Sequence, residues 1–157
     1  MLTRESAQVD GFVYDFVNEF VNRIPFNIFL GFELASLENE RVQFTLAMRD
    51  ELVGNFVHGI LHGGVISSLI DTAGGTMALV AGLTRDPESE RHAILSRLAK
   101  SGTIDMRVDF LRPGRGTEFT CTANLMRCGN KVAVVRTEFE NEQNELVAVG
   151  TGSYLCS

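Results

Sequence analysis

Apolar residues recur every three or four positions near the start of the chain. The pattern runs from Val9 to Ile24, and Pro25 interrupts it. This spacing is typical of an amphipathic helix whose apolar side faces a core. We therefore predict an N-terminal helix within residues 1–25.

Alternation of apolar and polar residues with a period of two predicts the strands. It first runs from Glu33 to Met48, with a bend or an interruption near Glu38. It returns in four later segments, separated in part by Gly- and Asn-containing turns. These segments cover residues 103–110, 119–125, 131–139 and 146–155. We expect them to form an antiparallel meander.

Helical spacing returns between residues 62 and 83, with apolar side chains on nearly all sides. A helix of this kind should be largely buried. Its Gly74-Gly75 pair costs helix stability, about 1 kcal/mol per glycine relative to Ala. We expect another backbone to approach closely there.

The order of elements favours an α+β fold in which one antiparallel sheet wraps around the long central helix. The length of 157 residues is typical of one domain, here residues 1–157. We divide it into the N-terminal helix, residues 1–25, and a core, residues 26–157. A polar segment at 84–101 is expected to be a loop, or partly helical.

Composition excludes several classes of protein. The 14 basic and 20 acidic residues give a net charge of −6, and the basic residues are scattered, which argues against nucleic-acid binding. The N-terminus lacks an apolar signal core, and Asp71 interrupts the best candidate membrane span. We expect a soluble, cytoplasmic protein. The three cysteines form no CxxC pair, so neither a disulfide framework nor a metal site is predicted.

The central helix opens with HGGVISSLID, residues 62–71, which places a carboxylate among apolar residues. A buried Asp without a partner costs several kcal/mol or takes up a proton. Asp71 is therefore either compensated by a partner or used in chemistry.

This string, followed by TIDMRVDFLRPG at 103–114, resembles the hotdog-fold acyl-CoA thioesterases of the phenylacetate-pathway and 4-hydroxybenzoyl-CoA thioesterase type. The resemblance covers about residues 26–155. It implies a hotdog fold with an added N-terminal helix and the hydrolysis of acyl-CoA thioesters.

The resemblance implies roles for several residues. Gly63, at the helix start, would offer its N–H to the thioester oxygen as that oxygen gains negative charge. Asp71 would act as a nucleophile or as a general base that activates water. Thr103 matches a residue that positions this water, although a Thr on a strand face is an equally good interpretation. His62 is also included among the catalytic candidates, and the resemblance implies that it is mainly structural or helps to shape the carbonyl site.

An asparagine often precedes the histidine of the HGG string by six residues in this family. That position is Phe56 here, and the available Asn55 is displaced by one residue. We include Asn55 among the catalytic candidates on the condition that a small bulge restores its place.

No phosphate loop, dinucleotide motif or metal-ligand cluster is found, so no cofactor is expected beyond the CoA of the substrate. Gly64 and basic residues near strand ends are the candidates for holding the substrate and its phosphates. These basic residues are Arg112, Arg115, Arg127 and Lys131. The many Phe residues between 12 and 32 favour medium- to long-chain fatty acyl groups.

Gly63 and Asp71 are eight residues apart, about 12 Å along a straight helix, so one chain cannot bring both to the same carbon atom. Family members are dimers with shared sites, and many pair into tetramers. We therefore expect a homodimer that shares its active sites, or a dimer of dimers. Two alternatives stay open: a non-catalytic acyl-CoA sensor and an acyl-thioester hydratase or dehydratase.

Overall fold

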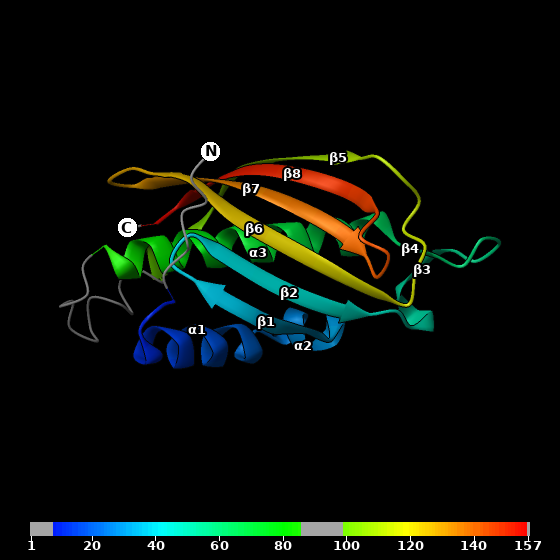
Figure 1. The fold of residues 1–157 in the computed structure, drawn as a ribbon, viewed down its shortest axis with the longest axis horizontal. Helices are drawn as coiled ribbons and strands as arrows, with labels where there is room; N and C mark the ends of the chain where they lie inside the picture. Colours follow the sequence, from blue (N-terminus) through cyan, green and yellow to red (C-terminus); the bar gives the residue numbers. More distant parts are fainter. Residues whose placement is uncertain (1–7, 86–98, 157) are drawn as a thin grey trace.

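The computed structural model describes residues 8–85 and 99–156 (Figure 1). The helices are α1 Gly11–Arg23, α2 Pro25–Leu30 and α3 Gly63–Thr84, with a short 3-10 turn at Asp50–Leu52. The strands are β1 Phe32–Glu38, β2 Arg41–Ala47, β3 Val53–Asn55, β4 Ile60–Leu61, β5 Gly102–Phe110, β6 Glu118–Cys128, β7 Val132–Asn141 and β8 Leu146–Leu155. Most of the polar segment expected at 84–101 lies outside the described residues.

Six strands form one antiparallel sheet in the order β1-β2-β6-β7-β8-β5, and β3 and β4 form a separate small hairpin. The sheet curves around α3 (Figure 1). Burial alternates along β7 from its first to its last residue, so one face of this strand is directed to the core and the other outward. The predicted arrangement of a sheet around a long helix is present.

α3 is the centre of the core. Leu69, Ile70, Ala73, Met77 and Val80 are at most 1% exposed, and they pack against the inner side chains of the sheet. By length and composition α3 could cross a membrane, but 61% of its most apolar window is buried inside the fold. A core helix has this property because it needs apolar residues on several sides.

Proline divides the N-terminal region into two helices. The Asp10 carboxylate caps α1 by accepting a hydrogen bond from the Phe12 N–H, at 2.7 Å. Ile24 has extended backbone angles, as expected for a residue before proline, and ends α1. Pro25 then occupies the first turn of α2, where its missing N–H has no cost. The predicted helix is correct, but the sequence pattern did not reveal α2.

Two details of the sheet differ from the prediction. The interruption near Glu38 is a tight turn, so residues 33–48 form the hairpin of β1 and β2 instead of one bent strand. The four later strands are not a simple meander, because β5 pairs with β8 at the sheet edge and not with β6. Periodicity identifies a strand but does not specify its neighbour.

The glycine pair of α3 accommodates a side chain, not a backbone. Tyr154 on β8 is 2% exposed, and its ring lies against Gly74. A Cβ added to Gly74 would overlap the Tyr154 hydroxyl and lie 2.5 Å from Cζ. At Gly75 the nearest atom of that ring is 3.9 Å from an added Cβ. Only Gly74 is required by this contact.

Replacing these two glycines should therefore have opposite effects on stability. Gly75→Ala should leave the free energy of unfolding unchanged or raise it by up to about 1 kcal/mol, because alanine favours a helix. Gly74→Ala should lower it by about 1–2 kcal/mol, since overpacking outweighs that gain. Urea denaturation of both variants measures the difference. Equal stabilities would show that Tyr154 does not restrict Gly74.

Candidate active site

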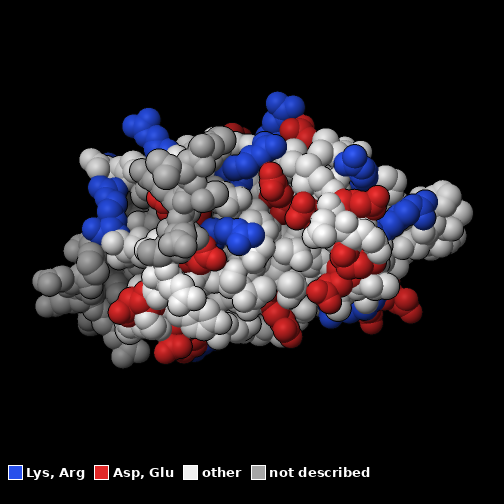
Figure 2. Space-filling model, in the orientation of Figure 1, with Lys and Arg blue, Asp and Glu red and all other residues white. Residues whose placement is uncertain are grey.

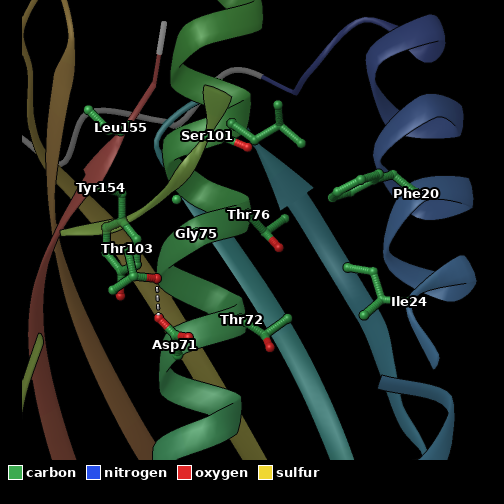
Figure 3. Close-up of a pocket in the computed structure, with 12 residues that line it drawn as sticks. Phe20, Ile24, Asp71, Thr72, Gly75, Thr76, Ser101, Thr103, Tyr154 and Leu155 are labelled. Carbon is green, nitrogen blue, oxygen red and sulfur yellow. Dashed lines mark hydrogen bonds between the residues drawn. The ribbon is translucent and has the colours of Figure 1, made fainter. Parts of the chain in front are cut away.

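Asp71 and Thr103 lie together although 32 residues separate them. Asp71 is on the half-exposed side of α3, and Thr103 is near the start of β5. The Thr103 hydroxyl donates a hydrogen bond of 2.7 Å to Oδ1 of Asp71 (Figure 3). A register shift between Thr103 and Asp105 interrupts the pairing of β5 with β8 next to this contact. Asp71 thus has the partner that its position required, and one carboxylate oxygen is held in place.

A cavity of about 180 Å³ opens beside this pair, between α1, α3 and the paired ends of β5 and β8 (Figure 3). It is lined by Phe20, Ile24, Asp71, Thr72, Gly75, Thr76, Leu79, Ser101, Gly102, Thr103, Tyr154 and Leu155. Asp71 is the only carboxylate among these residues, and none of them is a Lys, Arg or His.

The sequence interpretation did not identify Tyr154 as part of the site. Burial raises the pKa of its hydroxyl, and the negative charge of Asp71 raises that pKa further. The hydroxyl therefore stays protonated beside the carboxylate at neutral pH. The alternation along β8 could have indicated it, because Gly150, Gly152 and Tyr154 share the inner face of this strand.

The start of α3 forms a second group of candidate residues. His62 is the N-cap, and its Nδ1 accepts a hydrogen bond of 2.8 Å from the Gly64 N–H. Within the described parts of the chain, the Gly63 N–H has no acceptor. Gly63 lies against the ring of Phe110, where an added Cβ would be 3.4 Å from Cε1. Because His62 occupies the N–H of Gly64, Gly63 keeps the free donor of the helix end.

Asn55 lies near this helix start, at the end of β3. Its Oδ1 accepts a hydrogen bond of 3.1 Å from the Val57 N–H, which shapes the turn between β3 and β4. Phe56, at the tip of that turn, is 91% exposed. Asn55 is thus engaged in a local turn, and it is not among the residues that line the cavity beside Asp71.

The basic candidates do not form one cluster. Arg112 follows β5 and donates a hydrogen bond of 2.8 Å to the carbonyl oxygen of Leu146, at the Gly63 end of the fold. Arg127 and Lys131 are at the opposite end of the sheet, where they line a shallow cavity with Val132 and Val134. Figure 2 shows Lys and Arg interspersed with Asp and Glu on the visible face, without a continuous patch of one sign.

The cysteines are free thiols and lie outside the cavity beside Asp71. Burial raises the pKa of the Cys121 thiol, and it raises the pKa of Cys156 to about 11. A protonated thiol is a poor nucleophile. These two cysteines are therefore poor candidates for a nucleophile. In the described residues, no group of three or more His, Cys, Asp or Glu side chains could hold a metal ion.

Gly63 and Asp71 are separated along one helix. Both belong to α3, eight residues apart, which corresponds to about 12 Å of helix rise. The free N–H of Gly63 and the carboxylate of Asp71 in one chain are consequently too far apart to contact the same substrate atom.

Comparison with known proteins identifies the family. The family model described as the thioesterase superfamily matches residues 58–148. The chain is 46% identical, over 136 residues, to the medium/long-chain acyl-CoA thioesterase YigI of Escherichia coli strain K12. The aligned residues cover 87% of this chain and 88% of that protein.

Solved structures give the same result. A thioesterase-superfamily protein of Shewanella oneidensis superimposes with a TM-score of 0.88 at 35% identity, over 95% of this chain and 100% of the other. The PaaI protein of Escherichia coli, from the phenylacetic acid degradation operon, gives a TM-score of 0.74 at 22% identity over 91% of each chain, which shows the fold alone. The predicted hotdog fold is confirmed, and the chain belongs to the thioesterase superfamily.

Proposed function

We propose that this protein hydrolyses medium- and long-chain acyl-CoA to the free acid and CoA. The observation that carries this proposal is the Asp71 carboxylate, held by Thr103 at a cavity whose described lining contains no Lys, Arg or His side chain. The identity of 46% to an enzyme named as a medium/long-chain acyl-CoA thioesterase supports the substrate class.

Asp71 is the reactive group of the proposal. Thr103 holds Oδ1, so Oδ2 is the oxygen that is directed to the substrate or to water. As a general base it takes a proton from water while the water oxygen attacks the thioester carbon. As a nucleophile it attacks that carbon itself, and water then hydrolyses the anhydride. In both routes the C–S bond breaks, the thiol of CoA leaves with a proton, and the acyl group leaves as the acid.

Gly63 supplies the hydrogen-bond donor for the thioester oxygen. Its N–H is the first of α3, where the helix dipole favours negative charge. A thioester oxygen placed there is stabilised as the carbon becomes tetrahedral. His62 supports this role by binding the neighbouring Gly64 N–H, which fixes the helix end. In this proposal Gly64 contributes through its small size and not through its N–H.

The active site requires two copies of the chain, because Gly63 and Asp71 of one copy are about 12 Å apart. A twofold axis that places two α3 helices antiparallel brings Gly63 of one protomer to Asp71 of the other. We therefore include a homodimer with two shared sites in the proposal.

Two surfaces support such a dimer. β5 pairs only with β8, so its other edge offers free backbone groups among the described strands. Apolar side chains lie on and just after this edge strand: Ile104 and Phe110 are each 54% exposed and Leu111 is 49% exposed. The less buried side of α3 carries Ser67 and Ser68 between Gly63 and Asp71. Small residues of this kind allow a second helix to approach.

The remaining parts of the proposal concern CoA and its surroundings. In the shared site, the Arg112 end of one protomer lies beside the Asp71 end of the other, so Arg112 is the preferred phosphate ligand, with Arg127 and Lys131 as further candidates. The reaction needs no bound cofactor. A cytoplasmic location, a role in fatty acid metabolism and pairing of dimers into tetramers stay predictions.

Removing the reactive oxygen should abolish most activity. Asp71→Asn should lower kcat by about 10²- to 10⁴-fold on an acyl-CoA panel followed by release of free thiol. Thr103→Val should lower it by about ten- to a hundredfold, because the carboxylate loses its hydrogen bond. Thr120→Val, the same change on the outer face of β6, is the control and should behave as the wild type. Full activity of Asp71→Asn would exclude Asp71 as the nucleophile or general base. No turnover by the wild type would favour the alternative function, a non-catalytic acyl-CoA sensor.

Mixing two inactive variants tests the shared site. Gly63→Pro removes the N–H but keeps the helix, since proline is accepted at the first helical position and His62 already has extended angles. After subunit exchange with Asp71→Asn, each mixed dimer regains one complete site. Activity should return to about a quarter of the wild-type level for a random mixture. Exchange proven by mass spectrometry without recovered activity would argue against sites made by two protomers.

A further inference from the structure

We propose that α1 forms the outer wall of the acyl-chain pocket and that Phe20 limits the length of the chain. This inference rests on the proposed function. It states that the cavity beside Asp71 binds the acyl end of the substrate. It gives the added N-terminal helix a role in specificity.

The chemistry of the lining distinguishes the two ends of acyl-CoA. The phosphates of CoA require cationic or N–H donors, whereas none of the described residues that line this cavity is a Lys, Arg or His. Its apolar side chains are Phe20, Ile24, Leu79 and Leu155. The cavity therefore suits the acyl group. The CoA portion extends away from the cavity, on the other side of the thioester.

The cavity follows α3 away from the reactive carboxylate. Asp71, Thr72, Gly75, Thr76 and Leu79 all line it, and this spacing selects one side of a helix. From Asp71 to Leu79 the helix rises by about 12 Å. An acyl chain whose thioester carbon lies at Asp71 can thus extend towards the C-terminal half of α3.

Two side chains from α1 and its C-terminal end cover this side of α3. Figure 3 shows Ile24 and Phe20 in succession along α3, with Phe20 farther from Asp71 along the cavity. α1 is anchored by other residues, Val17 and Val21, which are 0% and 1% exposed. Phe20 and Ile24 are only half-buried. Phe20 packs in part against the core, and the exposed part of each of these two side chains can pack against a bound acyl chain.

Gly75 forms the wall of the cavity on the side of α3. A Cβ there would be 3.9 Å from the Tyr154 ring, which is an ordinary contact. A methyl group at this position therefore narrows the cavity without disturbing the fold. Gly75→Ala and Phe20→Ala change the same space in opposite directions.

The experiment measures kcat/KM of the full-length protein on saturated acyl-CoA from short to long chains, together with the melting temperature of each variant. Phe20→Ala should move the preferred chain length upward by two or more carbons, about fourfold in kcat/KM for each methylene that becomes buried. Phe12→Ala is the matched control: Phe12 is on the same helix, 56% exposed, and does not line the cavity. It should keep the wild-type profile.

Gly75→Ala should shift the profile towards shorter chains, and this variant tests the assignment even where Phe20→Ala lowers stability. A profile that neither variant moves, or that Phe12→Ala moves equally, would contradict the assignment while leaving the proposed hydrolysis intact. A wild type that hydrolyses no acyl-CoA would instead refute the proposed function, and this assignment would fall with it.

Discussion

The burial of α3 is the constraint on which the rest of the structure depends. Its apolar residues occupy more than one side, so a single flat surface cannot remove them from water. The six-stranded sheet satisfies the helix by curving around it, and β6, β7 and β8 contribute most of the covering face. Side chains such as Phe119 and Phe139, both 0% exposed, fill the space between sheet and helix. The candidate site residues Asp71 and Thr103 lie where this cover ends.

Asp71 shows how a carboxylate is tolerated in such a helix. It lies at the boundary between the side that the sheet covers and the side that it leaves open, where the desolvation cost is smaller than in the core. Thr103 then supplies a hydrogen bond from the edge strand β5. The core helix and the edge strand thus hold the acid together, and Asp71 can stay accessible to a substrate. The same fold would not accept a carboxylate on the buried side of the helix, at Ile70 or Ala73, which are at most 1% exposed.

The sequence predicted most of the elements but not their pairing. Periods of 3.6 and two identified α1, α3 and the segments that form the six-stranded sheet, because those periods follow directly from which side chains are buried. They did not identify the short strands β3 and β4. They did not identify α2, whose six residues are too short to show a period. They also did not place β5 at the sheet edge beside β8, since pairing depends on the path of the whole chain.

The candidate site divides in a similar way. Asp71 and Thr103 were predicted as site residues because two sequence motifs resemble those of hotdog-fold thioesterases. The structure places these two residues in direct contact. The alternation along β8 places Tyr154 on the inner face of the strand, but it does not show that Tyr154 lines the same cavity as Asp71. The effect of Tyr154 on α3 was visible as the Gly74-Gly75 pair, but the sequence cannot show which side chain occupies the space above a glycine.

The open side of α3 also explains why an added helix is compatible with the proposed dimer. Towards the C-terminal end of α3, the open side faces α1 across the cavity that contains Thr72, Thr76 and Leu79. Towards its N-terminal end, the open side carries Ser67 and Ser68 and is followed by the free donor of Gly63. Asp71 lies between these two parts. A second protomer that covers the N-terminal part therefore does not compete with α1 for the same surface, and the carboxylate lies where the two covers meet. In the proposed dimer, the thioester carbon would lie at that junction, with its acyl chain beneath α1 and its oxygen directed to the helix end of the other protomer.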